Sequence, residues 1–423
     1  MGKSSQQEKD QFSLMEEDQS RPSETLIPKI KEGSPPFKKD YQTIVIGCGG
    51  IGSAALYWLA RQSGGNVLGL EQYRLGHSLG GSHDHSRIIR LSYHAPEYAA
   101  LAPHTYIAWR ELESESGIKL IHQTGGIQFG PYELGEVSKY AASMTQLGVP
   151  FEQLSQGEAT RRFPQFRFHD SDQILFQASD GFIDPRLANA AHISLARARG
   201  ATIMEDTPVE RVEAVGKGVV VHTSRGRFTA RSLVVTAGAW TNQILKWLGM
   251  RLPLYVTEEQ VTYFATPHLR DFSPDRFPIW VWHGEQVFYG FPVYGEVATK
   301  AGQDVGGDRV TVESRKLEPN PRCLDNLTRF LEERIPSFLG PILYTKPCLY
   351  TLTPDRNFII DKHPKHPNIT VAIGAGHGYK FAALIGRILS DLALQDSTPF
   401  PIQGFSIERP AITEPSYPTT LTI

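Results

Sequence analysis

Hydrophobic and polar positions change period along the chain, and each change marks an expected element. Residues 43–46 are all β-branched and predict a buried strand. Residues 53–62 carry apolar side chains at helical spacing and predict a helix that Gly64 ends. Residues 66–70 predict a second strand. The succession predicts a strand–helix–strand unit near the start of the chain.

Three glycines join the first strand to the helix. Gly47, Gly49 and Gly52 have the spacing G-x-G-x-x-G, which permits a tight turn, close approach of a pyrophosphate to the backbone, and close helix–strand packing. A phosphate there would bind amide groups at the positive end of the helix dipole. Glu71 ends the second strand, where a carboxylate can accept hydrogen bonds from a ribose. An acid at this place argues against the 2′-phosphate of NADP, while NAD and FAD both fit.

The alternation of strands and helices continues to residue 393, with a second strand–glycine–helix unit near the end. A strand at 369–373 runs into Gly374, Gly376 and Gly378, and a helix at 381–393 follows. The other expected helices cover residues 97–117, 132–147, 185–199 and 323–339. The other expected strands cover residues 125–130, 201–205, 218–223, 226–230, 232–240, 253–266, 277–289 and 358–361.

The composition is that of an ordinary globular protein. A length of 423 residues favours two to three domains or one large two-domain enzyme. The net charge of -2 gives no electrostatic case for nucleic acid or a membrane surface, and no apolar run approaches the ~20 residues of a membrane helix. Three scattered cysteines favour a reducing compartment. Residues 1–40 lack a signal-peptide core and are expected to be a disordered tail, so we expect a cytoplasmic protein.

A loop rich in glycine, serine and histidine follows Glu71 and ends in two arginines. Such a loop cannot bury itself, so Arg87 and Arg90 face either solvent or the anionic groups of a ligand. The run His83-Asp84-His85 also suggests a metal. No fourth ligand lies near it in the sequence, and we expect no metal site.

Four further motifs keep a fixed mutual spacing. They are Gly81-Ser82-His83 with Ser86-Arg87-Ile88-Ile89-Arg90, Lys300 after Tyr289-Gly290-Phe291-Pro292, Lys346-Pro347-Cys348-Leu349-Tyr350-Thr351, and Gly376-His377-Gly378-Tyr379-Lys380. Together with the first glycine turn, they resemble the monomeric sarcosine oxidase family of flavin amine oxidases, which includes N-methyltryptophan oxidase and pipecolate oxidase. The resemblance covers residues 41–411.

The resemblance implies an α/β fold, in which a Rossmann-type FAD-binding domain is joined to a discontinuous substrate domain on a mixed, largely antiparallel sheet. The FAD-binding domain is expected to comprise residues 41–95, 170–250 and 345–410. The substrate domain is expected to comprise residues 96–169 and 251–344, and residues 411–423 a C-terminal tail.

The same resemblance implies that the first glycine turn holds FAD. The backbone of Val209 would meet the adenine, and Arg87 would lie along the flavin. The thiolate of Cys348 would bond covalently to the flavin, which raises the reduction potential of the ring. Without the resemblance, a buried free cysteine is the alternative.

Further residue roles implied by the resemblance concern the substrate and oxygen. Arg90 and Lys380 would bind the substrate carboxylate, and His83 and Tyr289 would be polar groups near the flavin. Lys300 would lie over the flavin and activate oxygen, since a cation in a low dielectric stabilises the charge that oxygen acquires.

The expected reaction is oxidation of a secondary α-amino acid to an imine, with O2 reduced to H2O2 by a monomeric enzyme. The alternatives are a flavin dehydrogenase with another electron acceptor and a non-catalytic FAD-binding protein. The chain departs from the family at three places. Asp84 replaces a glycine, the loop before His377 is one residue shorter, and Asp304 stands where a histidine lies beside the substrate nitrogen. An acid at 304 predicts a more cationic or differently hydrogen-bonded amine.

Overall fold

The first glycine-rich unit folds as its pattern predicts. In the computed structural model, which describes residues 38–420, β1 (Asp40–Ile46) leads through the turn into α1 (Gly50–Ser63). β2 (Val67–Leu70) returns parallel to β1. Most of β1 and all of β2 are buried, as expected of parallel strands covered on both faces. The expected tail lies outside the described residues except for residues 38–40.

An eight-stranded sheet extends from β1 in both directions. Its strands run in the order β10, β11, β12, β1, β2, β9, with β20 also paired to β12 and β19 to β20. β9, β2, β1, β12 and β20 are parallel to their neighbours in that series, whereas β10, β11 and β19 form antiparallel pairs. The strands not yet given bounds are β9 (Thr202–Met204), β10 (Val209–Val215), β11 (Gly218–Thr223), β12 (Gly226–Val235), β19 (Ile359–His363) and β20 (His366–Ile373).

β12 is one strand where the sequence predicted two. Its first half pairs with antiparallel β11 and alternates between buried and exposed positions. Residues 233–235 pair with both parallel strands β1 and β20, and residues 232–235 are all buried. The change of pattern therefore reflects a change of neighbours within one strand, which periodicity alone cannot separate from a break.

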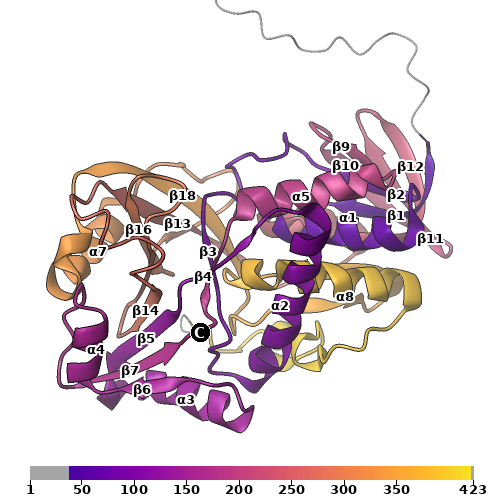
Figure 1. Cartoon of the computed structure of the whole chain (residues 1–423). Helices are drawn as coiled ribbons and strands as arrows, with labels where there is room; N and C mark the ends of the chain where they lie inside the picture. Colours follow the sequence, from indigo (N-terminus) through magenta and orange to yellow (C-terminus); the bar gives the residue numbers. More distant parts are fainter. Residues whose placement is uncertain (1–37, 421–423) are drawn as a thin grey trace, which may run out of the picture. The chain divides into compact units, whose positions relative to one another are not determined.

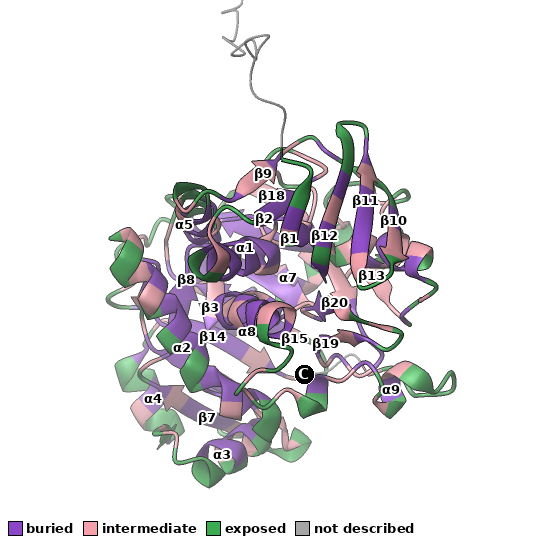
Figure 2. Ribbon diagram, turned by 90° about the vertical axis from the view of Figure 1, so that its right-hand side faces the viewer, coloured by how far each residue is buried: buried purple, intermediate pink, exposed green. Residues whose placement is uncertain are grey.

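Four helices pack together beside this sheet (Figure 1). α1 lies between α5 (Pro185–Ala198) and α8 (Ala382–Gln395), and α2 (Pro96–Ser116) packs on α8. Asp184 caps α5 by accepting hydrogen bonds from the first backbone amides of the helix, as its sequence predicts. Figure 2 shows that α1 and α8 are buried along most of their length.

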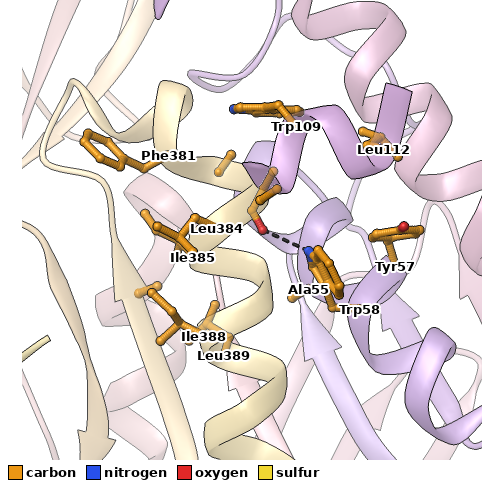
Figure 3. Close-up of a cluster of buried hydrophobic side chains, with 14 of the residues drawn as sticks. Ala55, Tyr57, Trp58, Trp109, Leu112, Phe381, Leu384, Ile385, Ile388 and Leu389 are labelled. Atoms are coloured by element: carbon orange, nitrogen blue, oxygen red, sulfur yellow. Dashed lines mark hydrogen bonds between the residues drawn. The ribbon is translucent and has the colours of Figure 1, made fainter. Parts of the chain in front are cut away.

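The contact between α1 and α8 holds the helix that begins at the glycine turn. Trp58 donates its indole N–H to the carbonyl oxygen of Ala383 at 2.9 Å (Figure 3). Gly386 allows the close approach, because a Cβ there would lie 2.5 Å from atoms of Ala54. Each fully buried leucine or isoleucine in this cluster contributes about 1.5–3 kcal/mol to stability. The start of α1 is thus fixed in place by a large apolar core.

A nine-stranded sheet carries the second half of the predicted chemistry. Its strands run in the order β17, β13, β16, β15, β14, β5, β7, β6, with β18 also paired to β13. All neighbours are antiparallel except β14 and β5. Its strands are β5 (Gly126–Pro131), β6 (Glu152–Leu154), β7 (Asp172–Gln177), β13 (Tyr255–Phe264), β14 (Ile279–His283), β15 (Val287–Phe291), β16 (Thr299–Asp304), β17 (Asp308–Val310) and β18 (Ile342–Leu352).

The remaining elements are short or lie beside the two sheets. β3, β8 and β4 form a three-stranded sheet in that order. None of the helices within 38–420 is both long and apolar enough to cross a membrane. The elements are β3 (Arg87–Ile89), β4 (Ile121–Gln123), β8 (Gly181–Ile183), α3 (Glu136–Gln146), α4 (Gln156–Arg162), α6 (Thr241–Leu245), α7 (Pro321–Arg334), α9 (Pro410–Thr413) and the 3-10 turn η5 (Gly378–Phe381).

Four strands that carry predicted site residues were not predicted: β3, β10, β16 and β18. The sequence of β16 is polar and contains a glycine, yet the strand is almost wholly buried. β18 contains Pro347, which is compatible with a strand that pairs on one side only. The expected domain boundaries at 170 and 345 leave β7 and most of β18 on the FAD side, whereas both strands pair within the nine-stranded sheet.

Candidate functional site

A cavity of about 840 Å³ joins the two glycine-rich units and both large sheets. Of the predicted site residues, Gly52 and Lys300 are not among the described residues that line it. Ten others are: Gly47, Gly49, Glu71, His83, Arg87, Arg90, Val209, Tyr289, Cys348 and Lys380. One hollow therefore brings together residues that are up to about 330 positions apart in the sequence.

The glycine turn has no room for side chains. Gly47 has a φ of +90°, which L side chains rarely adopt, and its N–H donates to the carbonyl of Leu70 at 2.9 Å. A Cβ on Gly52 would collide with the carbonyl oxygen of Gly47 and lie 2.7 Å from Thr236 Oγ1. Gly52 thus allows helix–strand packing from behind the cavity, as its place in the motif predicts. The first turn of α1 contains no acid, so its amides present a positive potential to the cavity.

Glu71 is buried beside this turn. Its carboxylate accepts hydrogen bonds from the backbone amides of Cys48 at 2.8 Å and Tyr73 at 3.1 Å. Burial opposes ionisation, but His77 and these two amides outweigh it and lower the pKa of Glu71. The ionised carboxylate lines the cavity and retains acceptor capacity for ribose hydroxyls. The glycine turn with its free amides and the carboxylate of Glu71 together fit the ADP part of FAD.

His83 and Arg87 follow Glu71 in the sequence and also line the cavity. His83 is buried, and neither ring nitrogen has a hydrogen-bond partner among the described residues. Burial, reinforced by the nearby Arg87, lowers the pKa of His83 to about 3, so the ring is neutral at physiological pH. Arg87 is held by the carbonyl oxygens of Ser86 at 3.0 Å and Gly81 at 3.4 Å. The loop thus supplies one neutral ring and one cation.

Lys300 and Asp84 form a buried ion pair beside the cavity. Lys300 Nζ lies 2.6 Å from Asp84 Oδ2 and also donates to the carbonyl oxygen and the hydroxyl of Ser86, at 2.8 and 3.1 Å. Asp84 Oδ1 accepts a hydrogen bond from Tyr263 at 2.7 Å. Burial opposes ionisation of Asp84, but Lys300 and Arg87 lower its pKa far below the usual value. Burial lowers the pKa of Lys300 to about 8, although Asp84 opposes this.

Arg90 lines the same cavity as Glu71. It is buried, and it donates to Gln128 Oε1 at 3.0 Å and to the hydroxyl of Tyr140 at 3.4 Å. Its Nε has no hydrogen-bond partner in the described part of the chain. The ring of Tyr93 lies under the guanidinium, 5.1 Å from its central carbon. The guanidinium is thus fixed by neutral groups and keeps its positive charge for a ligand.

Lys380 lies in η5, directly after the second glycine loop. Its ammonium lies 5.8 Å from the ring centre of Tyr93, the same ring that contacts Arg90. Burial, followed by repulsion from Arg90, lowers the pKa of Lys380 well below its usual value. Asp304 and Asp180 oppose this effect. A carboxylate entering beside Lys380 would supply the counter-charge that the pocket lacks.

Cys348 and Tyr289 line the cavity from neighbouring parts of the nine-stranded sheet. Cys348 is a buried free thiol on β18. Burial raises its pKa to about 12, while Arg87 acts in the opposite direction. Burial also raises the pKa of Tyr289. Both groups are protonated at neutral pH without a ligand, so neither acts as a ready-made base.

Asp304 lines the cavity and is paired with a buried cation. Arg356 donates to both carboxylate oxygens of Asp304, at 3.0 and 3.5 Å. Arg356 is 1% exposed, and its backbone carbonyl is 3.0 Å from Nε2 of His377. A buried guanidinium already balances the charge of this carboxylate, so the expectation that Asp304 favours a more cationic or differently hydrogen-bonded amine stays a prediction.

Several residues of the site were missed by sequence reasoning. Lys346 lines the cavity and lies two positions before Cys348, on the same face of β18. The alternation of that strand could have identified it. No sequence signal marks the polar residues around Arg90 and Asp304, which are Gln128, Tyr140, Asp180, His283 and Arg356.

Five aromatic residues between positions 280 and 294 divide between the cavity and the core. Of the five, Tyr289 lines the main cavity. Trp280 is buried among other aromatic rings, and Tyr294 packs on Phe182. Trp282 and Phe288 line a separate small hollow beside α7. For four of the five positions, packing in or beside the sheet is the role that the structure supports.

Comparison with known proteins gives consistent matches over nearly the whole chain. A family model described as FAD dependent oxidoreductase matches residues 42–392. A monomeric sarcosine oxidase of Streptomyces avermitilis is 36% identical, and the match covers 87% of this chain and 97% of that protein. A peroxisomal sarcosine oxidase of Homo sapiens is 32% identical over 87% of this chain and 96% of its own length. The solved structure of NikD, an unusual amino acid oxidase, is similar with a TM-score of 0.77, 30% identity, and coverage of 87% and 98%.

Proposed function

The chain belongs to the family of FAD-dependent oxidoreductases, and from this premise we propose that it is an oxidase of secondary α-amino acids such as N-methyl amino acids. The observation that carries the proposal is the pair Arg90 and Lys380, which line the same cavity as the glycine turn. Two basic groups that share contact with the ring of Tyr93 suit a substrate carboxylate. The relatives named sarcosine oxidase support this substrate class.

The residues of the cavity divide among the parts of the cofactor. Gly47 and its neighbours would hold the pyrophosphate, Glu71 the ribose, and the backbone of Val209 the adenine. Arg87 would lie beside the flavin ring, and Cys348 would attach to it covalently. Bound FAD supplies the acceptor for a hydride from the substrate carbon.

Substrate binding would couple the carboxylate to the charge of Lys380. A charge-assisted hydrogen bond contributes about 1.5–3 kcal/mol, so Arg90 and Lys380 together orient the substrate strongly. The pKa of Lys380 is low because of burial and Arg90, and an incoming carboxylate favours its protonation. The substrate ammonium could supply that proton. Its loss would leave the neutral amine that hydride transfer requires.

Covalent attachment through Cys348 is part of the proposal. The thiol must ionise to react, and burial opposes this by raising its pKa. Arg87 is the cation that favours the thiolate most. We also propose that O2 is the electron acceptor. The same proposal includes a monomeric enzyme in the cytoplasm.

A dehydrogenase that uses another acceptor is the second candidate. The observation that favours it is the enclosure of Lys300 by Asp84 and Ser86. The test compares O2 with an artificial dye during turnover of an N-methyl amino acid. An oxidase yields one H2O2 per substrate oxidised. Turnover that requires the dye, without peroxide, identifies the dehydrogenase.

A further inference from the structure

Asp84 separates the charge of Lys300 from the cavity. Asp84 lines the cavity, whereas Lys300 is not among the described residues that do. The two side chains are 1% and 2% exposed, and their charged atoms are 2.6 Å apart. In so buried a pair the anion cancels most of the field of the cation at the cavity surface.

The ammonium of Lys300 is also fixed in direction. An ammonium has three N–H groups, and here they have three acceptors: Asp84 Oδ2, Ser86 O and Ser86 Oγ. The ring of Phe291 lies 4.4 Å from Nζ and that of Tyr263 5.9 Å. Contact with a ligand in the cavity would require one of the three bonds to open.

The backbone at Asp84 is held in an unfavourable conformation to place this carboxylate. Its φ is +94°, in the region that favours glycine. Tyr263 and Lys300 fix the two carboxylate oxygens in this position. Strain of this kind persists only where surrounding contacts determine the geometry, and it is concentrated at functional sites.

Few other groups near the pair change charge around neutral pH. Arg87 is a permanent cation, burial lowers the pKa of His83 to about 3, and burial raises that of Cys348 to about 12. Burial also raises the pKa of Tyr263 and Tyr344 and lowers that of His85. The charged and titratable groups that face the pair are Arg87, His83, His85, Tyr263, Tyr344 and Cys348, and Lys346 acts on His83.

We propose that Asp84 is a positioning residue that holds Lys300 and restrains the transfer of electrons from the reduced flavin to O2. The inference rests on the proposed function. In this step the reduced flavin loses two electrons, O2 accepts them, and two protons complete H2O2. A full positive charge near O2 would speed the step, and the carboxylate of Asp84 cancels that charge.

Removing the carboxylate has two effects. In Asp84→Asn, protonated Lys300 is a cation without a counter-charge. At pH values where Lys300 is protonated, O2 therefore reoxidises the flavin about 10-fold faster than in the wild type. The same change removes the group that keeps Lys300 protonated against burial and Arg87. The pH midpoint of reoxidation therefore falls from about 8 by roughly 1–3 pH units.

The test uses holoenzyme reduced anaerobically with dithionite and mixed with O2 at a series of pH values. Because dithionite reduces the flavin without any substrate, this test does not depend on the substrate class. If the proposed substrate class is wrong, the amines will fail to reduce the flavin, which is a separate observation. A second readout is the titration of Lys300, followed by NMR of ¹³C-labelled lysine and assigned from the signal absent in Lys300→Met. The expected result is a lower midpoint in both measurements for Asp84→Asn.

Matched variants separate this role from a structural one. Asp172→Asn breaks another buried ion pair, with Arg334, and should leave the midpoint unchanged. Asp84→Gly, which suits the backbone at this position, should reproduce the shift seen with asparagine. The proposal is overturned if Lys300 titrates at the same pH in wild type and Asp84→Asn. It is also overturned if Lys346→Met, rather than Lys300→Met, abolishes the pH dependence.

Discussion

Breaking the buried ion pair between Asp304 and Arg356 should destabilise the protein strongly. In Asp304→Asn the guanidinium of Arg356, which is 1% exposed, loses the carboxylate that accepts two of its hydrogen bonds. Lys380 and Arg90 lie in the same group of charges and add repulsion. An uncompensated buried charge of this kind costs about 3–5 kcal/mol in the free energy of unfolding. Arg356→Met should cost a similar amount, because it leaves the carboxylate alone.

The double variant Asp304→Asn/Arg356→Met provides the decisive comparison. It removes both charges, so it should be more stable than the sum of the single effects predicts, with a coupling energy of about 2–3 kcal/mol. Unfolding by urea is measured on holoenzyme samples of equal flavin content, because bound cofactor adds to stability. Single variants within about 1 kcal/mol of the wild type, or additive effects, would refute the reasoning.

Three further predictions concern single side chains of the site. Arg90→Met should raise the KM for an amino acid substrate about 10- to 100-fold, by loss of a charge-assisted hydrogen bond, as steady-state kinetics will show. Cys348→Ser should release its flavin on acid precipitation, whereas the wild type should retain it; equal release from both contradicts covalent attachment. Burial raises the pKa of Asp180 to about 7, so folding favours the protonated carboxyl. This carboxyl contributes fully to the free energy of unfolding below about pH 4, and the contribution is lost as the pH rises through 7. Asp180→Asn should remove that slope, and an unchanged pH dependence of unfolding argues against it.

Local motifs made the cofactor end of the site predictable. The spacing of Gly47, Gly49 and Gly52 is dictated by a turn and a helix contact within a few residues. Glu71 follows from the strand that the turn requires. The structure places these residues around one cavity as expected, except that Gly52 packs behind it. The fold class was likewise predictable, because the strand–helix–strand pattern is strong in this region.

The charge partners in the rest of the site were not predictable from local sequence. Asp304 and Arg356 are 52 positions apart, and they meet because the end of β16 lies beside the turn that follows β18. Lys300 lies on β16, which the sequence did not predict, opposite Tyr263 of β13, and Tyr263 also donates a hydrogen bond to Asp84. The position of Lys300 outside the cavity lining follows from this partner. Contacts of this kind depend on strand register, which hydrophobic periodicity does not determine.

Anaerobic reduction of the flavin by amino acids tests the central claim most directly. Purified holoenzyme is mixed without oxygen with sarcosine, other N-methyl amino acids, pipecolate and proline, and the yellow absorbance is followed. The proposed function predicts that at least one secondary α-amino acid bleaches the flavin and that the colour returns when O2 is admitted. It also predicts that Arg90→Met bleaches only at much higher substrate concentration. A flavin that stays oxidised with every secondary amino acid would contradict the account.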